Sequence, residues 1–132
     1  MAHPIIHAKS SAKKFGGIWE DYIHLHNWLD ETKAWVGHSN HRMFRHHSEG
    51  IFWCEHEFGT YITNSEGRMV PVRAIGEQHC MEDLGWIPTI KNYLDNMEVQ
   101  GWMFKPGDGR KMLKEMSKDK SDFVKQEKAQ LP

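Results

Sequence analysis

The chain has 132 residues, of which 39% are hydrophobic and 11% aromatic, and its formal net charge is −1. This length is typical of one domain, and the content of large apolar side chains excludes a disordered chain. Residues 1–104 hold nine Lys and Arg against thirteen Asp and Glu, whereas residues 105–132 hold eight against five. Neither part has the strongly basic footprint of a nucleic-acid-binding domain, which argues against nucleic acid as a partner.

The cysteines and the N-terminal sequence bear on where the protein works. Cys54 and Cys80 form neither a CxxC pair nor a disulfide framework. The N-terminus lacks the long apolar run of a signal peptide, and no stretch approaches the roughly 20 apolar residues of a transmembrane helix. We therefore expect a reduced, cytoplasmic protein with no membrane partner. Its oligomeric state stays open.

The first half of the chain predicts two helices. Residues 1–17 are expected to be extended, because Pro4 and a glycine pair interrupt them. Apolar residues at helical spacing predict a helix over residues 18–36, with a stripe that includes Tyr22, Leu25 and Leu29. A second helix is predicted over residues 41–58, between an Asn cap and Gly59, with His47 at the centre of its core-facing stripe.

The second half begins with a predicted β-hairpin over residues 60–73. An NSEG turn separates two short β-prone runs there, and Pro71 confines the second run to an edge. Further helices are predicted over residues 74–85 and from Pro88 onward. Residues 110–128 are helix-compatible but weakly amphipathic.

These elements predict a mostly α fold of the α+β class, with three or four packed helices and one hairpin. Residues 1–104 are expected to form a single helical domain. The Lys-rich residues 105–132 are expected to form a peripheral or mobile tail.

Helical phase decides which histidines face the interior. On the predicted helix 41–58, His47 points inward, whereas His41, His46 and His56 fall off the stripe. His26 borders the stripe of the first helix, with Asp30 one turn on. His79 and Asp83 share one face of the third helix in the same i, i+4 relation.

Three helices thus each send one histidine toward the interior, and we expect His26, His47, His79 and Asp83 to converge as metal ligands. Imidazole and carboxylate donors suit Zn, Mn, Fe or Ni. Asp30 is then expected either to orient a ligand histidine through a hydrogen bond or to act as a general base. Arg45 and Arg73 flank these elements and are candidates to hold a phosphate group.

A purely structural role for these histidines is the alternative to a metal site. A buried histidine bonded to a carboxylate is a common core contact, and the chain contains no HExxH, P-loop, GxSxG or zinc-finger motif. The other histidines are expected at the surface, with His7 kept as a reserve candidate.

Several stretches resemble a small family of uncharacterised bacterial and phage proteins, known as a domain of unknown function. They are EDYIHLHNWLDETKAW, HRMFRHHSEGIF, YITNSEGRMVPVRAIGEQHCMEDLG and IPTIKNYL, and the resemblance covers roughly residues 3–103. It implies a phage or prophage origin and brings no activity with it.

A weaker similarity is to metal-dependent phosphohydrolases of the HD type. His26, His47 and Asp83 fill three of the places in that family's ligand pattern. The His–Asp dipeptide is missing, because Ser48 follows His47, and His79 would have to substitute as a ligand.

Two functions follow as hypotheses. The first is a metal-binding domain that acts as a hydrolase on a phosphate-containing small molecule, such as a nucleotide or another phosphoester. The alternative is a non-enzymatic accessory protein that binds a host protein through exposed tryptophans.

Overall fold

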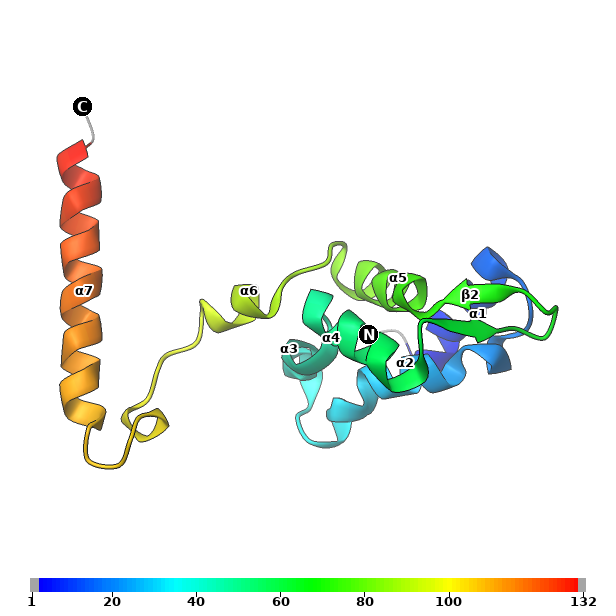
Figure 1. Ribbon diagram of the computed structural model, residues 1–132, viewed down its shortest axis with the longest axis horizontal. Helices are drawn as coiled ribbons and strands as arrows, with labels where there is room; N and C mark the ends of the chain where they lie inside the picture. The colour runs from blue at the N-terminus through cyan, green and yellow to red at the C-terminus, as the bar shows by residue number, and fades with distance from the viewer. Residues whose placement is uncertain (1–2, 131–132) are drawn as a thin grey trace. The chain divides into compact units, whose positions relative to one another are not determined.

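α-Helix dominates the protein, as the sequence predicts. The computed structural model describes residues 3–130, with side chains as far as residue 119. Within that range there are seven α-helices and a two-stranded sheet (Figure 1), so the predicted three or four helices are too few. The α-helices are α1 (Pro4–Phe15), α2 (Ile23–Asp30), α3 (Arg42–Arg45), α4 (Ser48–Phe58), α5 (Val72–Leu84), α6 (Ile90–Leu94) and α7 (Gly109–Gln130). Four 3-10 turns join them: η1 (Trp19–Asp21), η2 (Glu31–Ala34), η3 (His38–His41) and η4 (Gly101–Met103).

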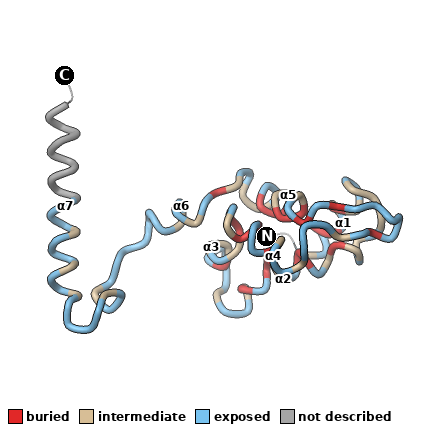
Figure 2. Tube along the Cα trace, viewed as in Figure 1, coloured by how far each residue is buried: buried red, intermediate tan, exposed pale blue. Residues whose placement is uncertain are grey.

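Contacts between Cα atoms divide the chain between Asp95 and Asn96. The first unit holds α1 to α6 and the hairpin, and the second holds η4 and α7. The buried positions lie in the first unit, and no residue in the range 96–119 is buried (Figure 2). None of the helices in the described range is long and apolar enough to cross a bilayer.

The N-terminal segment is helical, and the predicted extended conformation is wrong. Pro4 occupies the first turn of α1, where its missing N–H costs nothing. Gly16, at a φ of 88°, ends the helix, and its N–H donates to the carbonyl of Ala12. The helix turns His7, Ala8 and Ser11 into the protein.

The predicted helix 18–36 is divided into η1, α2 and η2. Its expected core stripe is nevertheless confirmed, because Tyr22, Leu25 and Leu29 are fully buried. They pack in one cluster with residues of α1, α4, β2 and α5: Ala8, Cys54, Val70, Val72 and Ile75. This cluster packs α2 and α5 together, and these two helices carry Asp30, His79 and Asp83.

The predicted helix 41–58 is broken in the middle. α3 ends at His46, and His47 is extended with a φ of −162° and a ψ of 172°. The Nδ1 atom of His47 accepts a bond from the N–H of Gly50, which caps α4. A Cβ at Gly50 would overlap the carbonyl oxygen of Arg45, so only glycine permits this tight corner.

The hairpin is confirmed. β1 (Tyr61–Thr63) and β2 (Met69–Pro71) pair antiparallel, with Ile62 opposite Val70. α5 begins directly after Pro71 and ends at Gly85, which adopts the left-handed conformation at a φ of 77°. The hairpin thereby leads the chain straight into the helix that carries His79 and Asp83.

Candidate metal centre

Six histidines are buried inside the first unit, which is an unusual polar content for so small a core. They are His7, His26, His41, His46, His47 and His79. The side chains of Asp30 and Asp83 are 3% and 5% exposed. Buried polar groups of this kind need partners or a bound ion.

Four of these side chains bring one donor atom each to a common point. They are Asp30 at the end of α2, His46 at the end of α3, and His79 and Asp83 on α5. His79 Nε2 lies 2.9 Å from His46 Nε2, 3.1 Å from Asp30 Oδ1 and 3.3 Å from Asp83 Oδ2. His46 Nε2 lies 3.2 Å from the same Asp30 oxygen and 3.0 Å from the same Asp83 oxygen.

These separations are those of a small coordination shell. Five of the six separations among the four donor atoms lie between 2.9 and 3.3 Å, near the spacing of neighbouring ligands around an ion with Zn–N bonds of roughly 2.0–2.1 Å. All four donor atoms lie within 4.8 Å of one another. The cluster therefore has the size and the donor types of a transition-metal site.

Both aspartates are ionised in this setting. Burial alone would raise their pKa values, but the bonds from His46 and His79 hold the pKa of Asp30 well below its ordinary value. The pKa of Asp83 is lowered in the same way, against the effect of burial, by His46, His7 and His79. Two buried carboxylates need compensating positive charge, which a divalent ion would supply.

The surroundings of the four donors consist largely of further histidines. The Nδ1 atom of His79 meets Nδ1 of His26 at 2.8 Å. His7 bonds Glu82 through Nδ1 at 2.8 Å, and its Nε2 lies 3.1 Å from Asp83 Oδ1. A ligand histidine or carboxylate is commonly held by partners of this kind.

His41 approaches the cluster from another side. Its Nδ1–H donates to the carbonyl of His38 at 2.6 Å, and its Nε2 lies 3.5 Å from Asp30 Oδ1. That Nε2 is buried and has no hydrogen-bond partner within the described part of the chain. His38 itself has a positive φ of 57°, which is uncommon for a residue with a side chain.

The structure brings together some of the predicted site residues and not others. His79 and Asp83 lie in the four-donor set as predicted, and Asp30 joins them with Oδ1 as a donor. His26 is not one of the four donors, and its Nδ1 atom contacts Nδ1 of His79. His47 is elsewhere, since its Nε2 bonds the carbonyl of Met43 and its Nδ1 caps α4.

His46 takes the place that the prediction gave to His47. The prediction placed both on one continuous helix, whose phase turned His46 toward solvent. The break between α3 and α4 reverses this, and His46 and His41 are both fully buried. Gly50 inside the predicted helix was the available signal, because glycine in a helix interior costs about 1 kcal/mol.

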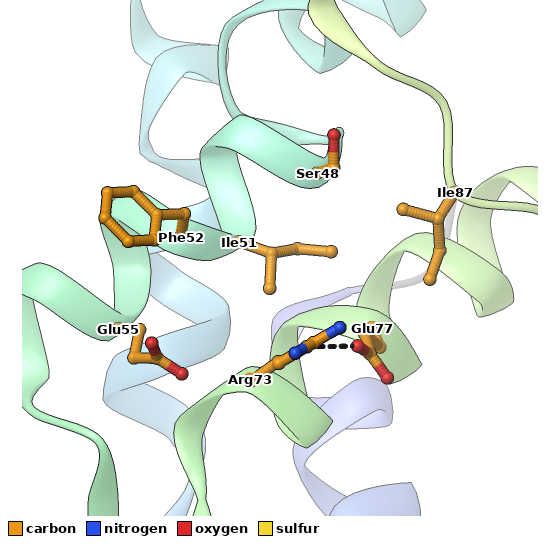
Figure 3. Close-up of a pocket in the computed structure, with 7 residues that line it drawn as sticks. All are labelled: Ser48, Ile51, Phe52, Glu55, Arg73, Glu77 and Ile87. Carbon is orange, nitrogen blue, oxygen red and sulfur yellow. Dashed lines mark hydrogen bonds and ion pairs between the residues drawn. The ribbon is translucent and has the colours of Figure 1, made fainter.

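The two arginines proposed as phosphate ligands lie outside the cluster. Arg45 stacks on Trp28 at 3.9 Å and donates to its carbonyl oxygen at 2.6 Å. Arg73 is exposed, pairs with Glu77 and lines a pocket between α4 and α5 that also contains Glu55 (Figure 3). Two carboxylates beside one guanidinium make that pocket a poor place for a phosphate.

Other cations do flank the donor set. Lys33 Nζ lies 3.3 Å from Asp30 Oδ2, and Arg42 Nη2 lies 3.9 Å from Asp83 Oδ1. The Nε atom of Arg42 is buried without a hydrogen-bond partner in the described residues. Asp30 and Lys33 also line a surface depression together with His3, Trp19 and Asn27.

The sequence matches a family described as a domain of unknown function, DUF6915, over residues 2–103. The chain belongs to this family. All four donor residues lie inside the DUF6915 match, and α7 lies beyond it. No curated protein and no solved structure matches the chain significantly.

Proposed function

We propose that this DUF6915 domain binds one divalent transition-metal ion through Asp30, His46, His79 and Asp83. The observation that carries the proposal is the set of five donor–donor separations between 2.9 and 3.3 Å. The Nε2 atoms of His46 and His79 lie 2.9 Å apart, and each of them also contacts both carboxylates, so the four donor atoms meet around one buried point. A dication at that point would bind all four atoms and compensate the charge of the two carboxylates.

The donor set favours some ions over others. Two imidazoles and two carboxylates suit Zn, Mn, Fe or Ni, whereas Ca and Mg prefer oxygen ligands. Imidazole nitrogen and carboxylate oxygen are also the ligand atoms that Zn takes in four-coordinate sites. A six-coordinate Mn, Fe or Ni ion bound to the same four atoms would keep two positions for water or substrate.

Because two coordination positions would remain open, we propose more specifically that the domain hydrolyses a phosphoester. An ion held by Asp30, His46, His79 and Asp83 would supply Lewis-acid chemistry, which activates water and polarises a phosphoryl group. Lys33 and Arg42 are the cations placed to contact such an anion, in the role first given to Arg45 and Arg73. Asp30 acts here as a ligand; as a general base it would have to use Oδ2, which accepts a bond from Lys33.

Metal analysis of protein purified without an affinity tag tests the binding step. We expect about one ion per chain, and we expect His46→Gln and Asp83→Asn each to weaken Zn binding by at least 100-fold. His56→Gln, an exposed histidine away from the site, is the matched control. A content below about 0.2 ion per chain, with no rise in melting temperature on adding Zn, Mn or Ni, would contradict the proposal.

Hydrolysis needs a separate test. Protein loaded with each ion in turn is assayed against nitrophenyl phosphate mono- and diesters and against nucleotides. Turnover that is lost with chelator and in Arg42→Ala, at unchanged metal content, supports the phosphohydrolase. Protein that binds metal but turns over none of these substrates would leave a metal-binding domain without this activity.

Binding of a host protein is a second candidate function, favoured by exposed aromatic side chains. Trp35, Phe52 and Trp86 are 66%, 64% and 53% exposed. Large exposed aromatic groups are typical of protein interfaces. Affinity capture of one specific host protein, unaffected by chelator and lost in Trp35→Ala, supports this function. If the host protein were captured only when the metal site is intact, the partner would bind at the metal site rather than through Trp35.

A further inference from the structure

We propose that Gln78, Ser11 and His26 form a hydrogen-bond chain that holds His79 in its ligand tautomer, with the proton on Nδ1 and Nε2 directed at the metal. These three are positioning residues, since none of them belongs to the four-donor set. The inference rests on the proposed metal site, but the proton positions in the chain can be measured without metal.

Gln78, the residue of the hydrogen-bond chain most distant from His79, determines which partner donates in each bond. Its amide nitrogen faces two acceptors, the carbonyl of His7 at 3.0 Å and Glu82 Oε1 at 3.1 Å. The amide oxygen must therefore be the atom that meets Ser11 Oγ at 2.7 Å. An amide oxygen only accepts, so the Ser11 hydroxyl donates to it.

Because the Ser11 hydroxyl donates to an oxygen, it must accept its bond with His26. The hydroxyl has a single hydrogen, and its two oxygen neighbours, Gln78 Oε1 and the carbonyl of His7, can only accept it. The contact between Ser11 Oγ and His26 Nε2, at 2.8 Å, must then be donated by the ring. His26 thus carries its proton on Nε2. The ring is fully buried and its two nitrogens contact Ser11 Oγ and His79 Nδ1 rather than a carboxylate, which favours the neutral form.

A neutral ring protonated on Nε2 presents a lone pair at Nδ1. That atom lies 2.8 Å from His79 Nδ1, so His79 donates this bond. The Nε2 atom of His79 remains as the donor atom for an ion shared with Asp30, His46 and Asp83. Ligand histidines in proteins are commonly fixed in this way through their second ring nitrogen.

All four members of the chain are buried, so water cannot replace a missing link. His26, His79 and Ser11 are fully inaccessible, and Gln78 is 5% exposed. If one link is removed, His26 can move its proton to Nδ1. His79 would then have to accept there and hold its own proton on Nε2, where the proton competes with the metal.

The experiment is nitrogen NMR of histidine-labelled protein together with Zn titration. In the wild-type protein we expect scalar coupling across the N–H···N bond between His79 and His26, with the proton attached to His79 Nδ1. Ser11→Ala should lose this pattern and weaken Zn binding by about tenfold. Ser65→Ala is the control, because this exposed hydroxyl bonds Asp21 and contacts no member of the hydrogen-bond chain.

The outcomes separate the inference from the proposed function. A proton found on His26 Nδ1 would overturn the chain, and so would Zn affinity in Ser11→Ala equal to that of the wild type. If the wild-type protein binds no metal, the proposed function fails, while the coupling in metal-free protein still tests the chain. If Ser11→Ala does not fold, the wild-type coupling alone decides the direction.

Discussion

His46 and His47 are neighbours with different tasks. His46 brings Nε2 to the candidate metal centre, while His47 bonds the first turn of α4 with one nitrogen and Met43 with the other. Capping and ligation are thus separable by mutation at adjacent positions.

We predict that His47→Ala lowers the free energy of unfolding by about 1 kcal/mol, the usual cost of losing an N-cap. His47→Asn should recover most of that loss, because asparagine also caps helices. Urea unfolding of metal-free protein measures both changes. Metal content should stay at about one ion per chain in both variants. A folded His47→Ala protein that no longer binds metal would contradict this division of tasks.

Cys54 is a core residue whose thiol should be inert in the folded protein. It is fully buried, and burial raises its pKa from the ordinary 9.0 to about 12. Ellman's reagent at pH 8 should therefore react with it at least about tenfold more slowly than after denaturation. Rapid reaction in native buffer would show that this part of the core opens.

The raised pKa also sets a pH dependence of stability. The folded state keeps the thiol proton that the unfolded state loses above pH 9, so the stability is intact below pH 9 and falls as the pH rises toward 12. At pH 10 the loss from this group is about 1 kcal/mol. Urea midpoints of wild type and Cys54→Ala, compared at pH 7 and pH 10, should converge at the higher pH. A difference between the two urea midpoints that is the same at pH 7 and pH 10 would contradict the raised pKa of Cys54.

The corner between α3 and α4 is the element on which the site depends most. It is held by the cap at His47, by a bond from the N–H of Ser48 to the carbonyl of Pro88 at 2.9 Å, and by the close approach of Gly50 to Arg45. Only with this turn does His46 face inward.

We predict that Gly50→Ala destabilises the protein by about 2 kcal/mol or more, because the new methyl group meets backbone that cannot rotate away. It should also weaken metal binding, since opening the corner displaces His46. Gly37→Ala is the control, as a Cβ there meets nothing within 4 Å. Unfolding midpoints and Zn titrations of both variants provide the measurement. Wild-type affinity in Gly50→Ala would show that His46 does not depend on the corner.

The same corner explains what could be predicted from the sequence. His79 and Asp83 lie on one unbroken helix, so helical spacing alone paired them correctly. His46 could not be placed in this way, because contacts with Pro88 and Arg45 interrupt the helix. α1 was missed for another reason: Pro4 and Gly16 are ordinary helix-boundary residues, but they were interpreted as breaks in an extended segment.

At the scale of the molecule, the four residues of the candidate metal centre all lie in the first unit. Its four donors lie between Asp30 and Asp83, inside the DUF6915 match, whereas α7 begins at Gly109. An ion bound there joins α2, the end of α3 and α5, which are distant in sequence. Binding should therefore raise the unfolding temperature of the whole unit rather than order one loop.

Residues 105–132 carry eight Lys and Arg against five Asp and Glu, and those whose side chains the structure describes, up to residue 119, contribute no donor to the candidate centre. We predict that a chain ending at residue 104 keeps the metal content, the Zn affinity within about twofold, and the urea midpoint of the full chain, because the contacts of the site lie before Asn96. Metal analysis and urea unfolding of the two chains side by side provide the measurement. If the shortened chain lost the ion while its helical circular dichroism persisted, residues 105–132 would have to support the site directly. In that case the metal-binding unit would be the full chain rather than its DUF6915 part.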